Sequence, residues 1–379
     1  MSENPDISII IPCRNEEKAL GKVIAQTKEV IEKHNLNAEI IISDSSTDSS
    51  PLIAKKLGAR LVKHDKKGYG IALLEGFKAA KGRYLFFADA DGTYDFNEIP
   101  KFLYYLQEGY DFVIGNRLKG KIAKGSMPFS HRYIGNPLLS LILRLFFESD
   151  IIDSHCGMRA ITKEALDKLE LKTTGMEFAS EMVIKAAKNK LKVKQFPIDY
   201  HRRIGESKLS SFADGWRHLR FMLMYAPDYL FMIPGVLIFL LGFLIMFLFL
   251  IGPVKISGLI LYTRPMIVGS FLTIIGYQIM ATGVYAKTYA VSIGFEKKDN
   301  FIDFLAKIIN FESGLVVGFI FILISIILGL IVLIDWIDRG FPGLLNISGI
   351  IFIFTLAVLG VQTMFSAFFL SILLVEKRN

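Results

Sequence analysis

The sequence predicts an α/β domain with a mainly parallel sheet, followed by an interfacial helix and four transmembrane helices. Up to about Ala226, charged residues are mixed with short apolar runs, whereas long apolar segments follow Tyr229. Of the 379 residues, 52% are hydrophobic, which is too many for an ordinary soluble protein. We therefore expect three parts: a domain at 1–210, an interfacial segment at 211–228 and a membrane domain at 229–379.

In the first part, strand-like runs alternate with helical patterns. Strands are expected at 7–11, 38–42, 60–62 and 84–88, and helices at about 17–33, 50–57 and 70–80. Strands separated by helices imply right-handed βαβ units and therefore a mainly parallel sheet. Such sheets bind ligands at the carboxyl ends of their strands, although the architecture alone does not decide a function.

The segment at 211–228 has an amphipathic pattern. Its apolar residues recur near helical spacing with basic residues between them: Phe212, Trp216, Leu219, Leu223 and Met224, with Arg217, His218 and Arg220. This pattern predicts a helix in the membrane interface, and packing against the first domain would explain it equally well. A second segment of this kind lies at 301–311.

Four apolar segments, at about 229–251, 266–289, 315–334 and 347–375, are each long enough to cross a membrane as a helix. An even number of spans places both ends of the membrane domain on one side. The polar opening of the chain shows no signal peptide, so we expect the first domain to stay in the cytosol.

The charges of the loops favour the same orientation. On the expected cytosolic side there are six basic residues, Lys287, Lys297, Lys298, Lys307, Lys377 and Arg378, against three on the other side, Lys255, Arg264 and Arg339. We expect a multi-pass protein of a prokaryotic plasma membrane with a cytosolic catalytic domain.

Composition also narrows the classes of partner and metal. The net charge of +8 fits an anionic lipid surface or phosphate ligands better than nucleic acid, because the chain has no dense basic and aromatic tract. Cys13 and Cys156 lack metal-ligand spacing, and the histidines form no zinc pattern. We therefore expect buried structural thiols and neither a zinc site nor a nucleic-acid partner.

An acidic turn follows the strand expected at 84–88. Asp89 and Asp91 come directly before Gly92, so two carboxylates lie at the carboxyl edge of the sheet. Carboxylates are hard ligands that suit Mg²⁺ or Mn²⁺. In an extended backbone the two side chains point to opposite sides, so one is expected to bind the metal while the other anchors the turn or a sugar hydroxyl. A solvated acidic turn would have the same pattern.

Three other strand ends carry polar residues. The first strand runs into 12–17 at a helix start, and the second into 43–50, where Asp48 suits helix capping and Asp44 has no evident structural task. A ring-nitrogen contact to a nucleobase would explain Asp44. At 66–70, glycines beside Lys67 would let backbone N–H groups approach a phosphate, although a plain glycine turn has the same pattern.

Together these segments resemble the family-2 glycosyltransferases of GT-A fold, and are similar to polyprenyl-phosphate enzymes such as dolichol-phosphate mannose and glucose synthases. The resemblance rests on Ile9–Glu17, Ser43–Ser50, Lys67–Gly82, Phe87–Asp95, Asp111–Arg117, Asp153–Ala160, Gly175–Glu181 and Arg203–Leu209. It implies an inverting enzyme that moves a hexose from a nucleotide sugar to polyprenyl or dolichyl phosphate with Mg²⁺ or Mn²⁺.

The resemblance also implies roles for individual residues. The nucleoside would contact Pro12, Arg14, Asn15, Glu16 and Asp44, with Lys67 near the donor, and Asp89 and Asp91 would contact the sugar and the metal. Some relatives have a glutamine where this chain has Thr93, so the metal ligands differ at this position. The continuation at 92–96 looks more like glucose-type members, so UDP-glucose is favoured over GDP-mannose or UDP-N-acetylglucosamine.

A phosphate acceptor needs cations rather than a general base, because it is largely dianionic at neutral pH. Candidate acceptor-phosphate residues are Arg117, Arg132, Arg203 and Lys208, and Arg117 and Arg203 join Asp89 and Asp91 as expected catalytic residues. Each cation would also suit an ordinary surface. Asp153 and Glu177 are further candidates for orienting sugar hydroxyls. Pairing with Arg159 would equally explain Asp153, and helix capping would equally explain Glu177.

Two rival functions share parts of this pattern. A processive polysaccharide synthase would have a similar domain and membrane helices, but the chain has no Gln-x-x-Arg-Trp sequence. A transporter or flippase with a nucleotide-binding domain would need ionisable residues within the spans or an internal repeat, and the sequence shows few of the former and none of the latter. The sequence does not determine the oligomeric state.

Overall fold

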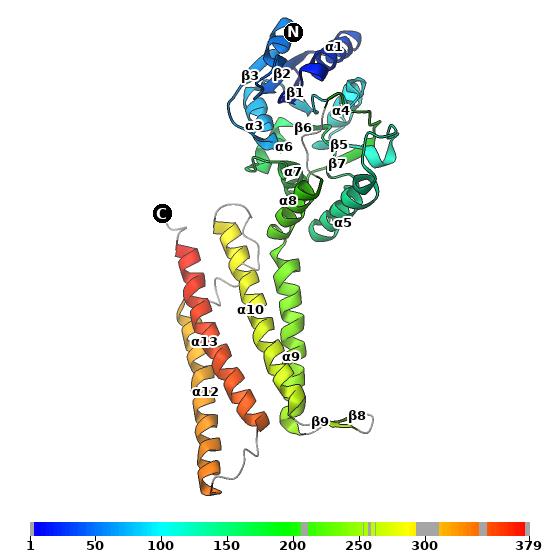
Figure 1. Cartoon of the computed structure of the whole chain (residues 1–379). Helices are drawn as coiled ribbons and strands as arrows, with labels where there is room; N and C mark the ends of the chain where they lie inside the picture. The colour runs from blue at the N-terminus through cyan, green and yellow to red at the C-terminus, as the bar shows by residue number, and fades with distance from the viewer. Residues whose placement is uncertain are drawn as a thin grey trace. The chain divides into compact units, whose positions relative to one another are not determined.

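The structure is a computed structural model that describes residues 4–205, 211–252, 254–256, 259–261, 263–292, 311–340 and 347–375 (Figure 1). It divides into two compact units, Met1–Met222 and Leu223–Asn379. This division lies inside the segment expected to connect the two domains. Each unit is described by itself.

The first unit is built on a seven-stranded sheet in the order β3-β2-β1-β4-β6-β5-β7. The strands are β1 Ile7–Cys13, β2 Ala38–Asp44, β3 Arg60–Lys63, β4 Tyr84–Phe87, β5 Phe112–Asn116, β6 Arg159–Thr162 and β7 Val193–Pro197. Strands β1 to β4 pair in parallel, β6 runs antiparallel to β4 and β5, and β7 pairs in parallel with β5. The predicted mainly parallel sheet is therefore confirmed.

Helices connect these strands and bury their apolar faces against the sheet. They are α1 Glu17–Lys33, α2 Ser50–Lys56, α3 Tyr69–Ala79, α4 Ile99–Gln107, α5 Asn136–Phe147, α6 Lys163–Leu169 and α7 Phe178–Lys188. Strand β1 is fully buried at Ile9, Ile10 and Ile11, as expected for the centre of a parallel sheet covered on both faces.

The register of the strands decides which residues leave the sheet at the same edge. Cys13 at the end of β1 lies opposite Asp44 at the end of β2, and Ile10 lies opposite Phe87 at the end of β4. The carboxyl ends of β1, β2 and β4 therefore meet at one edge. The acidic turn that starts after Phe87 leaves the sheet there.

Helix α8, Ser211–Met224, forms in the segment expected to be amphipathic. His218 hydrogen-bonds through its Nδ1 to the Ser180 hydroxyl in α7 at 2.8 Å. Phe221 and Met222 are buried, whereas Trp216 is 55% exposed. One face of α8 thus packs against the first unit, and a position in the membrane interface stays a prediction for the exposed face. The second amphipathic segment, at 301–311, falls outside the described residues except for its last residue.

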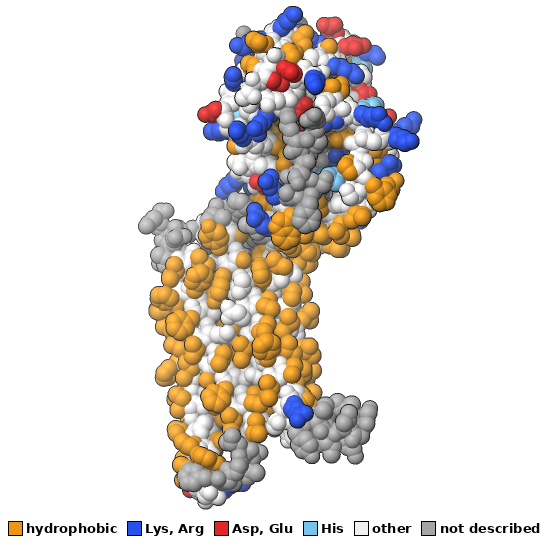
Figure 2. Space-filling model, viewed as in Figure 1, with side chains coloured by type: hydrophobic (Ala, Val, Ile, Leu, Met, Phe, Trp, Pro, Cys, Tyr) orange, Lys and Arg blue, Asp and Glu red, His pale blue; other side chains and the backbone are white. Residues whose placement is uncertain are grey.

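Within its described residues, the second unit has four helices long and apolar enough to cross a membrane, as predicted. They are α9 Ile233–Ile251, preceded by the single turn η4 Asp228–Met232, α10 Arg264–Ser292, α12 Phe311–Asp338 and α13 Ile347–Val375. Short strands β8 Val254–Ile256 and β9 Leu259–Leu261 follow α9. Figure 2 shows hydrophobic side chains over the visible face of these helices.

Glycines bring the membrane helices close together. A Cβ on Gly276 of α10 would lie 2.3 Å from the backbone N of Phe239 in α9, and one on Gly318 of α12 would lie 2.6 Å from the Gly360 carbonyl of α13. In lipid the hydrophobic effect does not drive helices together, so van der Waals packing between closely approaching backbones stabilises their association instead.

A buried cation lies at one end of α10. Lys287, counted among the loop charges from the sequence, is inside the helix, where its Nζ pairs with Asp228 at 2.8 Å. The other five basic residues counted on that side lie outside the described residues.

Neither cysteine of the chain should react with a thiol reagent in the native protein. Cys13 and Cys156 are both buried, and burial raises the pKa of each to about 12. Because the thiolate is the reactive species, reaction with dithionitrobenzoate at pH 8 should be slow in the folded full chain and rapid after denaturation. Rapid reaction of the native protein would contradict this packing.

Candidate active site

The acidic turn after β4 is held by its own side chains. Gly92 has a φ of 76°, a conformation that favours glycine. Asp91 is 6% exposed, and its Oδ1 accepts hydrogen bonds from the backbone N–H of Thr93 at 3.0 Å and from the Thr93 hydroxyl at 2.6 Å. One carboxylate oxygen of Asp91 therefore anchors the turn and the other, Oδ2, points away from it.

Arg203 brings three distant parts of the chain together. Its Nη1 donates to Asp91 Oδ2 at 3.0 Å, and its Nη2 forms a short ion pair with Glu16 at the start of α1. The backbone of the Arg203 segment is tied to the same turn, because His201 N donates to the Thr93 carbonyl and Ile204 N to the Asp91 carbonyl, each at 2.9 Å. The predicted residues Glu16, Asp91 and Arg203 thus form one cluster.

Asp89 lies in a partly closed, low-dielectric position beside this cluster. Burial, followed by the charge of Asp91, raises the pKa of Asp89 from 3.8 to about 7, although Arg117, Arg203 and Arg159 act in the opposite direction. A Cβ on Gly157 would lie 2.6 Å from Asp89 Oδ2, so only glycine leaves this carboxylate its space.

The two carboxylates fit a divalent cation with few protein ligands. Bringing Asp89 and Asp91 together is unfavourable without positive charge, and Mg²⁺ and Mn²⁺ accept carboxylate oxygens readily. Among the described residues no group of three or more His, Cys, Asp and Glu side chains is placed to hold a metal. Such a cation would therefore take most of its ligands from phosphate oxygens and water, as Mg²⁺ commonly does.

Arg117 is fixed by Asp153 rather than left open to solvent. Its Nε and Nη2 donate to the two Asp153 oxygens at 2.8 Å each, and its backbone N adds a third bond at 3.0 Å. Burial acts to lower the pKa of Arg117, but the charge and hydrogen bonds of Asp153, together with Tyr94 and Cys156, hold that pKa well above its ordinary value. The Arg117 guanidinium also lies 5.3 Å from the centre of the Tyr200 ring.

The alternative pairing of Asp153 with Arg159 is wrong. The Arg159 guanidinium donates instead to the backbone carbonyls of Ser154, Cys156 and Ala179, at 2.7, 2.7 and 3.0 Å. Arg159 therefore stabilises the loop before β6 through backbone carbonyls, and Asp153 is the counter-charge of Arg117.

The strand ends of β1 and β2 are joined by Asn15. Its Oδ1 accepts from Thr47 N at 2.8 Å, and its backbone N donates to the Ser46 hydroxyl at 2.7 Å. Asn15 has a φ of 54°, which asparagine tolerates better than most residues. Pro12, near the end of strand β1, is partly buried, and Arg14 is exposed.

Asp44 and Asp48 behave as differently as their sequence contexts suggest. Asp48 is not the N-cap expected for α2, which is Ser49, but it accepts from Ser50 N at 2.9 Å just before the helix and from Glu17 N at 3.2 Å, so its role is structural. Asp44 is completely buried, and neither of its carboxylate oxygens has a hydrogen-bond partner among the described residues. A buried carboxylate without a donor is costly, which makes Asp44 a candidate for contact with the donor group of a ligand.

The glycines near Lys67 serve packing. A Cβ on Gly68 or Gly70 would lie 2.2 or 2.4 Å from the carbonyl oxygens of Thr174 and Thr173. The N–H groups of Gly70 and Ile71 donate to carbonyls of the same loop at 3.2 Å each. These two donors are therefore not available to a phosphate, and Lys67 itself is exposed.

The remaining candidates lie elsewhere on the first unit. Arg132, in the turn η3 His131–Gly135, lies over the ring of its neighbour Tyr133 at 5.2 Å. Glu177 precedes α7 and accepts from Gly175 N at 3.2 Å, without a side-chain capping bond to the helix. Lys208 lies outside the described residues.

Two features of the site were not predicted from the sequence. The Tyr94 hydroxyl accepts from Gly157 N at 2.7 Å, which links the acidic turn to the loop that carries Asp153. A row of exposed apolar residues runs from the turn η3 into helix α5: Ile134 and Leu138 at 58% and 51%, and Leu141 and Leu145 at 45% and 61%. The apolar row could have been recognised in the sequence from its spacing of four, three and four residues. The hydrogen bond of Tyr94 could not, because it joins residues 63 positions apart.

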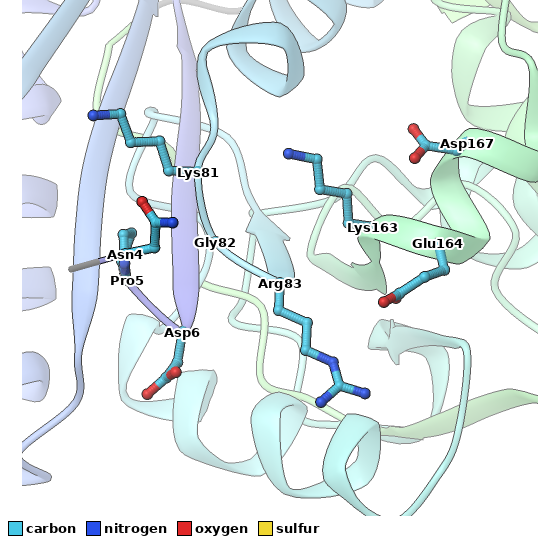
Figure 3. A pocket seen from close by; sticks show the side chains of 9 residues that line it. All are labelled: Asn4, Pro5, Asp6, Lys81, Gly82, Arg83, Lys163, Glu164 and Asp167. Carbon is cyan, nitrogen blue, oxygen red and sulfur yellow. The ribbon is translucent and has the colours of Figure 1, made fainter. Parts of the chain in front are cut away.

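A pocket at the other edge of the sheet is not the candidate site. It is lined by Asn4, Pro5, Asp6, Lys81, Gly82, Arg83, Lys163, Glu164 and Asp167 (Figure 3). These residues adjoin the amino ends of β1 and β4, whereas the acidic turn follows the carboxyl end of β4. Its acidic and basic side chains are mixed and produce no net preference for one charge.

Replacing Asp153 by asparagine should destabilise the first unit strongly. The Arg117 and Asp153 side chains are only 8% and 0% exposed, so Asp153→Asn leaves a buried guanidinium without its counter-charge. The expected loss is about 3–5 kcal/mol, seen as a lower thermal unfolding temperature of the full chain in detergent. Lys78→Gln, in a pair whose lysine is 70% exposed, is the control and should cost at most about 1 kcal/mol. Equal effects of the two variants would contradict a structural role for the buried pair.

Comparison with known proteins assigns the chain to a family. Residues 8–170 match the model of glycosyl transferase family 2, and residues 284–374 match that of the glycosyltransferase family 2 C-terminal transmembrane region. The low-salt glycan biosynthesis hexosyltransferase Agl6 of Haloferax volcanii is 37% identical over 97% of this chain and 88% of its own length.

Two shorter relatives match the first unit. The dolichyl-phosphate hexose transferase of Haloferax volcanii is 33% identical over 55% of this chain and 89% of its own. The UDP-N-acetylglucosamine–dolichyl-phosphate N-acetylglucosaminyltransferase of Methanococcus voltae is 32% identical over 51% of this chain and 84% of its own.

Among solved structures, glucosyl-3-phosphoglycerate synthase from Mycobacterium tuberculosis, in complex with Mn²⁺, UDP and product, is 21% identical. It has a TM-score of 0.48 over 59% of this chain and 80% of its own. The extent of the match to the Haloferax hexosyltransferase, together with the two family models, shows that this chain belongs to glycosyltransferase family 2 and is a membrane-embedded glycosyltransferase.

Proposed function

We propose that the enzyme transfers a hexose from a nucleotide sugar to a polyprenyl or dolichyl phosphate at the cytosolic face of a membrane. The observation that carries this proposal is the pair Asp89 and Asp91 at the carboxyl edge of the sheet, beside the unpartnered carboxylate of Asp44 and the cation of Arg203. The names of the relatives that act on dolichyl phosphate support the same acceptor.

A nucleotide with a ring N–H would supply the hydrogen-bond donor that Asp44 lacks among the described residues. An ionised carboxylate can only accept hydrogen bonds, and uracil and guanine each present a ring N–H donor, whereas the ring nitrogens on the pairing edges of adenine and cytosine are acceptors. Adenine and cytosine could donate to it only from their exocyclic amino groups, so with the ring N–H contact we propose, the unpartnered Asp44 favours UDP-sugars and GDP-sugars. Among these, UDP-glucose is our first choice because of the resemblance of the 92–96 segment to glucose-type members, with GDP-mannose and UDP-N-acetylglucosamine as the other candidates.

Asp91 and Asp89 would hold a Mg²⁺ or Mn²⁺ ion together with the diphosphate. A bound cation there would stabilise the negative charge that develops on the departing nucleoside diphosphate. Thr93 orients Asp91, because its hydroxyl donates to Asp91 Oδ1 at 2.6 Å. The chain thus uses the position where some relatives have glutamine to orient Asp91.

The acceptor side needs positive charge but no proton acceptor. A lipid phosphate is largely dianionic at neutral pH, so the site has to attract it, orient it and offset its charge. Arg203 is placed for this task beside Asp91, and Arg132 and Lys208 remain candidates by resemblance. Arg117 would act mainly through its field, since it is buried and its Nε and Nη2 are held by Asp153. A single in-line displacement would invert the anomeric centre.

The surface of the first unit suits an acceptor that resides in a bilayer. The exposed apolar row from Ile134 to Leu145 starts in the turn that carries Arg132 and continues along α5. Apolar side chains beside a basic residue favour contact with the lipid interface, where a polyprenyl phosphate presents its charged group.

Membranes that contain the enzyme should transfer label from one donor to lipid in a metal-dependent way. Radiolabelled UDP-glucose, UDP-N-acetylglucosamine and GDP-mannose, each with the same polyprenyl phosphate, test the donor, and EDTA tests the metal. Asp91→Asn should reduce transfer at least about a hundredfold, because it removes a charged ligand from the developing diphosphate. Label in polymer rather than in lipid, or full transfer in EDTA, would refute the proposal.

Replacing Asp44 by alanine should weaken donor binding more than the chemical step. We expect the donor KM to rise about tenfold or more with kcat changed much less, because a hydrogen bond between a charged group and the base is lost far from the reacting carbon. Asp48→Asn, in the same loop, keeps an acceptor for the helix start and serves as the control. An unchanged KM in Asp44→Ala would remove the base-recognition role.

A further inference from the structure

We propose that Arg203 is a resident counter-ion that occupies the metal-facing oxygen of Asp91 and exchanges with the divalent cation, so that metal binding precedes engagement of the acceptor phosphate by Arg203. This inference rests on the metal role of Asp91 in the proposed function. It deepens that function by giving Arg203 two alternative positions and the reaction an order of binding.

The two oxygens of Asp91 are not equivalent. Oδ1 already accepts from both the N–H and the hydroxyl of Thr93, at 3.0 and 2.6 Å. Oδ2 is the oxygen that Arg203 Nη1 contacts at 3.0 Å. A cation that binds Asp91 through Oδ2 therefore meets the guanidinium of Arg203, and the two positive charges cannot share that oxygen without strong repulsion.

The charges around Asp91 favour replacement of Arg203 by the divalent cation over binding of the cation beside Arg203. The Asp91 and Glu16 side chains are 9% and 11% exposed, so their negative charges are poorly solvated and need a nearby cation. Arg203 supplies one positive charge to the pair. A divalent cation would supply two, and it would satisfy Asp91 without the guanidinium.

Arg203 is more accessible to solvent than the other arginine expected in catalysis. It is 22% exposed, its Nη1 and Nη2 reach two different carboxylates, and its Nε is buried without a hydrogen-bond partner among the described residues. The Arg117 side chain is 8% exposed and donates two bonds to a single, fully buried carboxylate, Asp153. A partly exposed guanidinium shared between two carboxylates can give up one of them more readily than a buried two-pronged pair can separate.

The backbone beside Arg203 stays attached to the site when the side chain leaves. His201 N and Ile204 N donate to the carbonyls of Thr93 and Asp91, and neither bond involves the guanidinium. After release from Asp91, the Arg203 guanidinium therefore remains near the proposed metal site at Asp89 and Asp91. There it can donate to a phosphate that approaches the sugar. Before the cation binds, the guanidinium is paired with Asp91 and Glu16 and is not available to the acceptor phosphate.

Removal of Arg203 should make Mn²⁺ bind more tightly. The full chain in detergent is titrated with Mn²⁺ alone, and free Mn²⁺ is followed by its electron paramagnetic resonance signal. Arg203→Gln removes the competing charge, so the Mn²⁺ dissociation constant should fall about fivefold or more relative to wild type. Arg203→Lys keeps a charge but not the two-pronged contact, and its constant should lie between the two.

Arg202→Gln is the matched control. Arg202 is the preceding residue and donates from its Nε to the Lys124 carbonyl at 2.6 Å, so its loss changes the net charge equally and loosens the same segment. Its Mn²⁺ dissociation constant should stay within about twofold of wild type, because its charge does not contact Asp91.

The outcomes separate this inference from the proposed function. Unchanged or weaker Mn²⁺ binding in Arg203→Gln and Arg203→Lys would overturn the exchange, as would equal tightening in Arg202→Gln. Asp91→Asn should lose Mn²⁺ binding. If Asp91→Asn binds Mn²⁺ as wild type does, the metal role in the proposed function fails, whatever the arginine variants show.

Discussion

The structure of the site depends on the cost of placing two carboxylates, Asp89 and Asp91, in one corner from which much of the water is excluded. Burial and mutual repulsion raise the pKa of Asp89 to about 7, so this corner needs positive charge to hold both groups ionised. The surrounding architecture supplies space and charge for that purpose. Gly157 leaves room for Asp89, Thr93 orients Asp91, and Arg203 faces it.

Two arginines near this corner have different physical roles. Arg117 is deeply buried and forms a two-pronged pair with Asp153, which makes it a fixed source of positive field. Arg203 lies closer to solvent and bridges Asp91 and Glu16. A fixed charge suits a site that must always be electropositive, whereas an exchangeable one suits a site whose occupants arrive in sequence. The same residue type thus serves stability in one place and ligand exchange in the other.

The two units meet different solvent constraints. In the first, buried polar groups are satisfied by loops and helix starts, and the unpartnered Asp44 stands out because such groups are rare. In the second, glycines such as Gly276 and Gly318 let helices approach closely where lipid offers no hydrophobic driving force. A lipid acceptor would belong to both environments, since its phosphate needs the cations of the first unit and its chain needs the bilayer.

Apolar periodicity and length by themselves determined the βαβ units, the mainly parallel sheet and the four spans, because these depend on local patterns that burial enforces. The acidic turn was also evident, since a strand end is a local feature. Only the tertiary structure decided that Asp153 pairs with Arg117 rather than Arg159, that Gly68 and Gly70 serve packing, and that Arg203 contacts Asp91. Those contacts join residues far apart in the chain, and one sequence carries no signal for which distant charges will meet, because Coulomb attraction fixes no spacing along the chain.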